Sequence, residues 1–109
     1  MKKIETNLKD CYILEPDKFG EDRGYYSPFF AEKDYQENGL HSVKGIVQGA
    51  RSKSGKGIVR GLHFQKDPYC QSKIVECLTG AVLDVVVDLR KDSPTYMKWT
   101  SVELTPENG

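Results

Sequence analysis

The sequence predicts an all-β protein built as a sandwich or barrel, with one short helix. The chain contains several short runs rich in Val, Ile, Tyr and Phe, which favour strands over helices. Glycine, proline, asparagine and aspartate separate these runs and predict turns between them. One segment, 31–38, combines helix-forming residues with a helix stop signal.

The predicted elements follow one another through short connections. Strands are expected at 11–14, 25–30, 46–52, 57–65, 72–78, 81–89 and 99–104, with a charged, glycine-rich loop at 19–24. Pro28 confines its strand to a sheet edge or a bulge, because proline has no N–H to donate to a ladder. Asn38 is expected to end the helix. Gly80 is expected to lie in a hairpin turn that joins the strands at 72–78 and 81–89.

The composition fits one domain spanning residues 1–109, which can bury roughly two-thirds of its unfolded surface. Sixteen Lys and Arg residues balance sixteen Asp and Glu residues, so no overall field steers the chain toward nucleic acid or an anionic membrane. Cys11, Cys70 and Cys77 show no CxxC spacing and predict reduced thiols. We find no signal-peptide pattern and no apolar stretch long enough to span a bilayer, and we therefore expect a cytoplasmic protein.

The segment 57–65, read G-I-V-R-G-L-H-F-Q, is the first candidate for a functional site. Its apolar side chains are expected to be buried in a strand that also holds Arg60 and His63. Polar groups taken into a core destabilise it unless they are paired, which favours a role beyond packing. Strict alternation places Arg60 and His63 on opposite faces unless Gly61 forms a bulge. A purely structural histidine is the alternative.

The strand at 81–89 has one apolar face and one mixed face. The apolar face, which should meet a core, consists of Leu83, Val85, Val87 and Leu89. Asp84 and Asp88 lie on the other face, where they either line a polar cavity inside a barrel or face solvent, as the pattern alone favours. Lys73 is either a solvated flank or a partner across the hairpin from these two carboxylates.

Several blocks of sequence carry a resemblance to a known family. They are Asp22-Arg23-Gly24-Tyr25-Tyr26, Gln48 with Ser52 and Ser54, Arg60-Gly61-Leu62-His63-Phe64-Gln65, Gln71-x-Lys73-Ile74-Val75, and Asp84-Val85-x-Val87-Asp88-Leu89-Arg90 followed by Ser93-Pro94-Thr95. In this order they resemble the dTDP-4-dehydrorhamnose 3,5-epimerases. The resemblance implies a cupin jelly-roll fold, a homodimer that needs no cofactor, and a role in dTDP-rhamnose synthesis for cell-surface polysaccharides such as lipopolysaccharide. Because family members are longer, the chain is expected to be an N-terminal portion that lacks the C-terminal part of the fold.

The resemblance also implies roles for five residues. Members of the family epimerise C3 and C5 of a dTDP-linked 4-keto-6-deoxy sugar through an enolate. His63 matches the base that removes the proton, and an imidazole titrates near neutral pH. Lys73 matches the cation that stabilises the enolate oxygen. Arg23, Gln48 and Arg60 match positions that hold the nucleotide base and diphosphate, for which arginine forks are well suited.

A metal site is not expected. Gly57 and His63 fit the start of a cupin metal motif, but Gln65 stands where that motif places its second histidine. The other histidine, His41, lies in the connection after the predicted helix. A single imidazole holds zinc or iron poorly, so a metal-dependent cupin would need at least two further ligands.

The sequence departs from the family in ways that leave an alternative function open. Pro28 stands in place of a family glutamate, and Ala50 in place of a family asparagine. The family's general-acid tyrosine, and the aspartate that orients its histidine, correspond to positions after residue 109. The alternative is a truncated, non-catalytic cupin that binds a sugar nucleotide or only dimerises.

Overall fold

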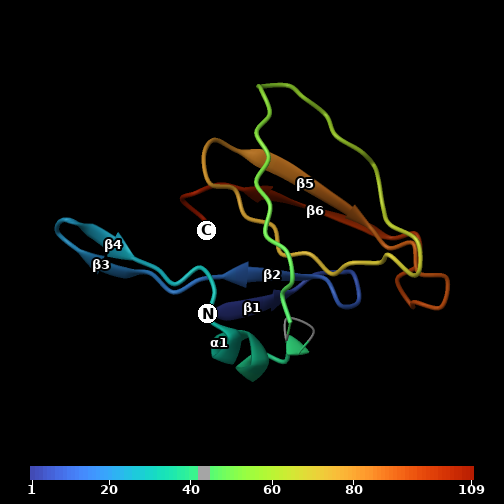
Figure 1. Cartoon of the computed structure of the whole chain (residues 1–109), viewed down its shortest axis with the longest axis horizontal. Coiled ribbons are helices and arrows are strands. Elements are labelled where there is room, and N and C mark those ends of the chain that lie inside the picture. The colour runs from blue at the N-terminus through green and yellow to red at the C-terminus, as the bar shows by residue number, and fades with distance from the viewer. Residues whose placement is uncertain (42–44) are drawn as a thin grey trace.

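The computed structural model describes residues 1–41 and 45–109, and within them it contains six strands and one helix. The strands pair into three separate two-stranded antiparallel sheets (Figure 1). In chain order the elements are β1 (Lys2–Glu5), β2 (Tyr12–Glu15), β3 (Phe19–Glu21), β4 (Gly24–Tyr26), α1 (Glu32–Glu37), β5 (Val82–Val87) and β6 (Trp99–Leu104). The predicted all-β class with one short helix is confirmed. No helix in these residues has the length and apolar character needed to cross a membrane.

The first hairpin pairs β1 with β2, and β1 is a strand that the sequence does not predict. The strand expected at 11–14 is present as β2. Thr6 orders the connection, because its Oγ1 accepts a hydrogen bond from the Leu8 N–H at 3.1 Å and donates one to the Cys11 carbonyl at 2.7 Å. Leu8 is only 2% exposed, so this connection contributes one of the few buried apolar side chains.

The β3–β4 hairpin projects from the rest of the molecule (Figure 1). Its pairing joins Glu21 to Gly24 across a two-residue turn, so the expected loop at 19–24 is in part a strand. The expected strand at 25–30 is also corrected, since β4 ends before Pro28. A proline cannot donate to a ladder, which accounts for that end point.

The helix α1 lies within the predicted segment and ends at Asn38 as expected. Tyr35 is its buried residue, with its ring centroid 5.1 Å from that of Phe30. Burial, and then the negative charge of Glu76, raise the pKa of the Tyr35 hydroxyl above its usual value. One aromatic side chain therefore anchors the helix to the rest of the chain.

The strand β5 pairs with β6, from Val82 opposite Leu104 to Val87 opposite Trp99. The expected hairpin between 72–78 and β5 is therefore wrong. Gly80 does lie in a bend, with φ +78°, but a turn makes a hairpin only where both flanking segments form a ladder.

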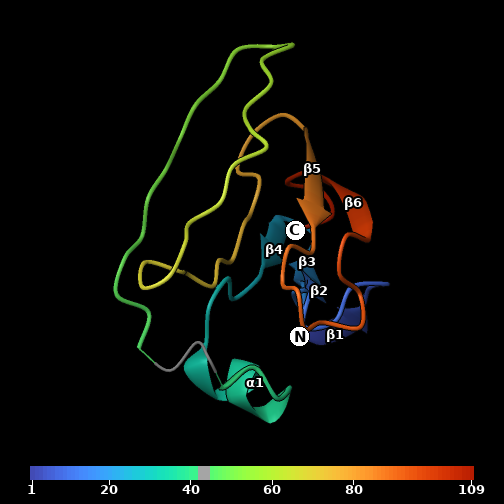
Figure 2. The same cartoon turned by 90° about the vertical axis from the view of Figure 1, so that its right-hand side faces the viewer.

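The stretch 45–81 contains no helix or strand. Figures 1 and 2 show it as a long excursion that leaves the region of α1, turns, and returns to the start of β5. The strands expected at 46–52, 57–65 and 72–78 are therefore absent from this structure. A strand needs a ladder partner, whereas the backbone bonds described within this stretch close turns, such as Ile58 N–H to the Gly55 carbonyl.

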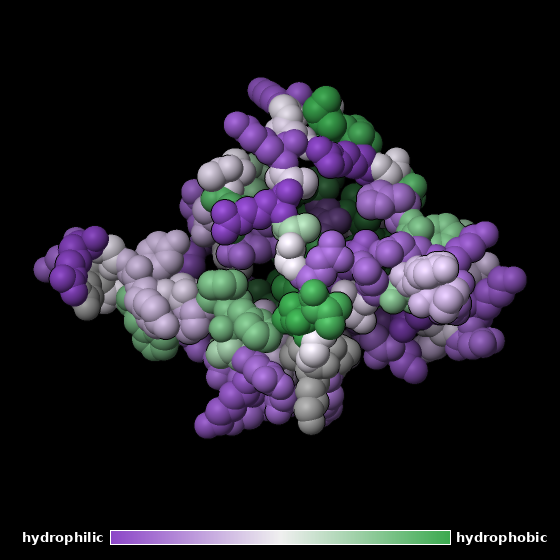
Figure 3. All heavy atoms as spheres, viewed as in Figure 1, coloured by the Kyte–Doolittle hydropathy of each residue, from purple (hydrophilic) through white to green (hydrophobic). Residues whose placement is uncertain are grey.

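The buried core is small. Among the described residues, the buried apolar side chains are Leu8, Tyr35 and Cys77. The predicted apolar face of β5 is not covered, since Leu83 is 66% exposed and Val85 is 39% exposed. Figure 3 shows hydrophobic side chains at several places on the surface among polar ones. Exposed apolar surface of this extent is typical of contact regions.

Candidate functional site

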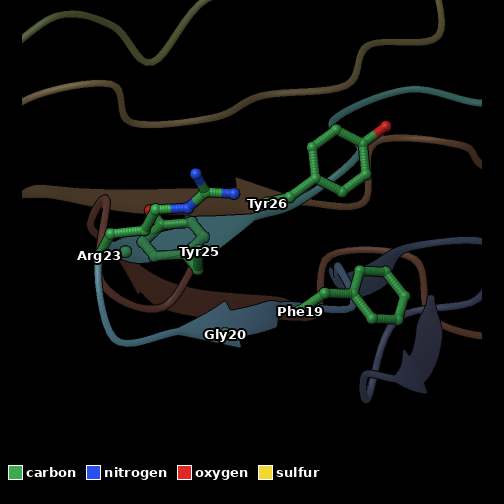
Figure 4. Close-up of a pocket in the computed structure, with 6 residues that line it drawn as sticks. Phe19, Gly20, Arg23, Tyr25 and Tyr26 are labelled. Atoms are coloured by element: carbon green, nitrogen blue, oxygen red, sulfur yellow. The ribbon is translucent and has the colours of Figure 1, made fainter.

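The β3–β4 hairpin carries a cavity of about 570 Å³ that includes Arg23 (Figure 4). Its lining residues are Phe19, Gly20, Arg23, Gly24, Tyr25 and Tyr26. The rings of Phe19 and Tyr26, from facing strands, stack with centroids 6.4 Å apart. Figure 4 shows the Arg23 side chain extending alongside Tyr25. Aromatic faces beside a guanidinium can accept a planar base and a phosphate.

A second cation reinforces this hairpin. Lys18 Nζ lies 5.0 Å from the centroid of the Tyr25 ring, and the same ammonium donates to the Glu107 carbonyl. Tyr25 is 62% exposed, so its ring is accessible to a ligand. Lys18 and Arg23 thus place two cations near the aromatic rings, in a stretch that also carries the acidic residues Glu21 and Asp22.

The segment 57–65 differs from its prediction in both conformation and burial. It forms no strand, and its apolar side chains are exposed instead of buried: Ile58 by 62%, Val59 by 89%, Leu62 by 77% and Phe64 by 63%. The hydrophobic pattern predicts burial correctly only where a second layer covers the segment. No such layer is formed over it by the described residues.

His63 is exposed, at the end of a backbone irregularity centred on Gly61. Gly61 has φ +96°, a value that side-chain-bearing residues rarely adopt. A Cβ at this position would lie 2.9 Å from His63 Cδ2, so the close approach of the imidazole also requires glycine. This irregularity interrupts the strict alternation that separates Arg60 from His63.

The two predicted nucleotide-binding residues near this segment are also exposed. Arg60 donates a hydrogen bond from its guanidinium to the Lys53 carbonyl at 3.2 Å. This bond bridges the glycine- and lysine-rich connection that precedes the histidine segment. Gln48 lies earlier on the same excursion, outside any strand.

Lys73 and Asp84 are not joined by the hairpin that would place them opposite each other. Asp84 is half-buried on β5 and lies opposite Val102 of β6. Lys73 is exposed in the stretch without strands, so the cross-hairpin pairing of Lys73 with the carboxylates is wrong for this structure. Among the described residues, neither His63 nor Lys73 forms a hydrogen bond or an ion pair. The catalytic roles of both stay predictions.

A second cavity, of about 550 Å³, brings the histidine segment next to β5. Its lining residues are Phe64, Gln65, Lys66, Asp67, Cys70, Val87, Leu89, Arg90 and Lys91. Cys70 Sγ donates to the Gln65 carbonyl at 3.2 Å, and its hydrogen bond with Asp67 raises the pKa of the thiol. The residues immediately after His63 therefore face the C-terminal end of β5.

Asp88 has a role that differs from both sequence interpretations. It neither faces solvent nor lines either cavity described above, but is buried, 6% exposed. Arg90, Ser93 and Thr95 all donate hydrogen bonds to its carboxylate. The signal was present in the sequence, because the spacing Asp-x-Arg-x-x-Ser-x-Thr supplies one acceptor and three donors within eight residues.

Within the residues that the structure describes, no group of three or more His, Cys, Asp or Glu side chains could hold a metal ion. The expectation that the site needs no metal stays a prediction.

Residues 5–109 match the sequence profile of the dTDP-4-dehydrorhamnose 3,5-epimerase family. The chain belongs to this family. Two family members named dTDP-4-dehydrorhamnose 3,5-epimerase illustrate the similarity. The one from Shigella flexneri is 46% identical over 108 residues, which are 99% of this chain and 59% of the relative. The one from Sinorhizobium fredii is 48% identical over 104 residues, which are 94% of this chain and 52% of the relative.

Solved structures of the family extend the similarity to the fold. The Elizabethkingia anophelis enzyme matches with a TM-score of 0.90 at 48% identity, over 99% of this chain and 58% of that one. The Legionella pneumophila enzyme, described as a complex with dTDP-4-keto-L-rhamnose, matches with a TM-score of 0.88 at 40% identity, over 98% of this chain and 56% of that one. The predicted family fold is therefore confirmed. The chain spans a little over half the length of these family members.

Proposed function

We propose that the protein carrying this sequence epimerises a dTDP-linked 4-keto-6-deoxy sugar at C3, C5 or both carbons. The observation that carries the proposal is the family match over residues 5–109, in a chain that also contains Arg60, His63 and Lys73 within the motifs that resemble the family's site. The ligand described for the Legionella relative, dTDP-4-keto-L-rhamnose, has this chemistry.

The chemistry of the sugar explains what His63 and Lys73 would do. C3 and C5 both adjoin the C4 ketone, so His63 can take a proton from either carbon as a general base. The electron pair of the broken C–H bond then passes into the carbonyl and leaves an enolate oxygen. The Lys73 ammonium stabilises that oxygen, a contribution typically worth about 3–4 kcal/mol for one preorganised donor. Return of a proton from an acid to the opposite face gives the epimer.

Arg23, Gln48 and Arg60 would hold the nucleotide part of the substrate. The cavity on the β3–β4 hairpin supports this role for Arg23, because it combines that guanidinium with exposed aromatic rings. A relative from Bacillus anthracis, 39% identical to this chain, is described with TDP and pyrophosphate bound. Asp84 would line the sugar cavity from β5.

We further propose that the protein works as a cytoplasmic homodimer that supplies dTDP-rhamnose for polysaccharides such as lipopolysaccharide. The exposed apolar side chains of the excursion and of β5 support a contact with another chain. Val47 is 94% exposed and Val59 is 89% exposed, and valines exposed to this degree gain stability when a partner covers them.

A second candidate function is that of a sugar-nucleotide-binding or dimerising module without catalysis. The exposure of both His63 and Lys73 favours it, because a base and a cation in open water lack the preorganisation on which catalysis depends.

Incubation with the dTDP-linked 4-keto sugar in D₂O separates the two functions. The epimerase is expected to introduce deuterium at C3, C5 or both, as read by NMR of the recovered sugar. The binding module would raise the melting temperature with dTDP and leave both carbons fully protonated.

A further inference from the structure

Asp88 is the centre of a hydrogen-bonded cluster that the proposed function does not use. Its Oδ1 accepts from the backbone N–H and from Nε of Arg90, at 3.0 and 2.9 Å. Its Oδ2 accepts from the second terminal nitrogen of Arg90 at 2.9 Å, and from the Ser93 and Thr95 hydroxyls at 2.6 Å each. Both oxygens of a buried carboxylate are thus fully occupied, as such a group requires.

The same cluster reaches a hairpin that is distant in the sequence. Arg90 donates to the Asp10 carboxylate at 2.9 Å and to the Lys9 carbonyl at 2.6 Å. The Thr95 hydroxyl accepts from the Lys9 backbone N–H at 3.1 Å. Lys9 and Asp10 form the turn between β1 and β2, so the bonds span eighty or more residues of sequence.

No ladder joins the two hairpins within the described residues. β1–β2 and β5–β6 are separate two-stranded sheets, and a two-stranded hairpin alone is marginally stable in water. Apart from the cluster, the side-chain bond from Asn7 Nδ2 to the Trp99 carbonyl, at 3.0 Å, links the same two regions. Polar contacts at the turns therefore hold the two hairpins together, as a shared ladder of backbone hydrogen bonds does in a larger sheet.

We propose that Asp88 and Arg90 form a latch that fixes the β1–β2 turn against the connection between β5 and β6. In this latch Asp88 orients the guanidinium, and the remaining donors of that guanidinium hold Asp10 and the Lys9 carbonyl. Only a planar fork with several donors satisfies both sides at once. The inference concerns the fold and is independent of the proposed function.

Amide hydrogen exchange on the Asp88→Asn variant tests the latch. The substitution keeps the size of the side chain but replaces one acceptor oxygen with a donor, which faces the donors of Arg90, Ser93 and Thr95. Exchange at the backbone N–H of Lys9 is expected to accelerate by about tenfold or more, because that N–H is held by the cluster. Asp92→Asn is the matched control, since Asp92 is exposed in the same connection.

Equal exchange at Lys9 in the two variants would overturn the latch. If Asp88→Asn fails to fold, Asp10→Asn gives an independent reading, because Asp10 is 55% exposed as a side chain and lies on one side of the latch only. It is expected to speed exchange at Lys9 and to leave the N–H of Met97, bonded to the Asp88 carbonyl at 2.7 Å, protected. Unchanged exchange at Lys9 in this variant would also contradict the proposal.

Discussion

Arg90 donates two parallel hydrogen bonds to the Asp88 carboxylate, each 2.9 Å long. This fork-to-fork geometry is the strongest form of a charge-assisted pair. Hydrogen bonds from Arg90, and then from Ser93 and Thr95, hold the pKa of Asp88 well below its usual range. The hydrogen bond to Asp88, and then the one to Asp10, raise the pKa of Arg90 above its usual value. Both shifts favour the ionised form of the Asp88–Arg90 pair.

Acid should destabilise the fold through Asp88. An unfolded aspartate has a pKa near 3.9, and the folded value lies below it. The unfolded state consequently binds the proton more readily, so the contribution of Asp88 to stability is full above about pH 5 and is lost progressively below about pH 4. Thermal melts from pH 7 down to pH 2 should show this loss.

The Asp88→Asn variant is the control for that pH dependence. An amide does not titrate in this range, so the variant should melt several degrees lower at pH 7 and show a flatter acid limb. A variant whose acid limb is as steep as that of the wild type would assign the pH dependence to other carboxylates.

Arg60→Ala should weaken binding of dTDP by about tenfold or more, because a guanidinium that holds a diphosphate makes charge-assisted hydrogen bonds. Isothermal titration measures the dissociation constant directly. Arg51→Ala is the matched control, since Arg51 is exposed on the same excursion. If both variants weaken dTDP binding equally, Arg60 contributes only through its general positive charge and does not contact the diphosphate specifically.

Lys73→Gln should lower kcat by about 10²–10³-fold, as expected for loss of one preorganised donor at an oxyanion. KM should change much less, because the interaction develops as the enolate forms. Steady-state kinetics with the dTDP-linked sugar separates the two parameters. Lys56→Gln, in an exposed loop, should leave both near the wild-type values, and a similar fall in kcat there would argue against a specific role for Lys73.

Leu8→Ala should destabilise this 109-residue chain by about 2–5 kcal/mol, because Leu8 is buried. In the monomeric chain, Val47→Ala should change the free energy of unfolding by less than about 0.5 kcal/mol, because Val47 is almost fully exposed when no partner covers it. Urea unfolding followed by circular dichroism compares the two. A large cost at Val47 would show that the excursion is covered in solution.

The elements that the sequence predicts correctly are those specified by local signals. Trp99–Leu104 forms β6 at the expected bounds, and Asn38 ends α1. The strand β6 is specified by its local residue pattern, and the end of α1 is specified by a helix cap. β1 is missed because Lys2–Glu5 has no clear hydrophobic alternation, and its pairing with β2 supplies what local sequence does not.

The excursion at 45–81 shows what local sequence signals do not predict. Val59, Leu62 and Phe64 have the composition of a buried strand, but composition does not specify which segment covers them. The site residues behave similarly, because Arg60, His63 and Lys73 were found from motif identity, and their approach to one another depends on that tertiary context. Asp88, expected on the mixed face of the strand at 81–89, instead follows the end of β5, and its burial by Arg90 and two hydroxyls involves residues outside the strand.

Exchange of solvent deuterium into the sugar tests the central claim most directly. The protein carrying this sequence, incubated in D₂O with the dTDP-linked 4-keto-6-deoxy sugar, should incorporate deuterium at C3, C5 or both. His63→Ala should slow incorporation by about 10²–10⁴-fold, while His41→Ala, which alters the other histidine, should leave it unchanged. Incorporation that proceeds at the wild-type rate in His63→Ala would contradict the account.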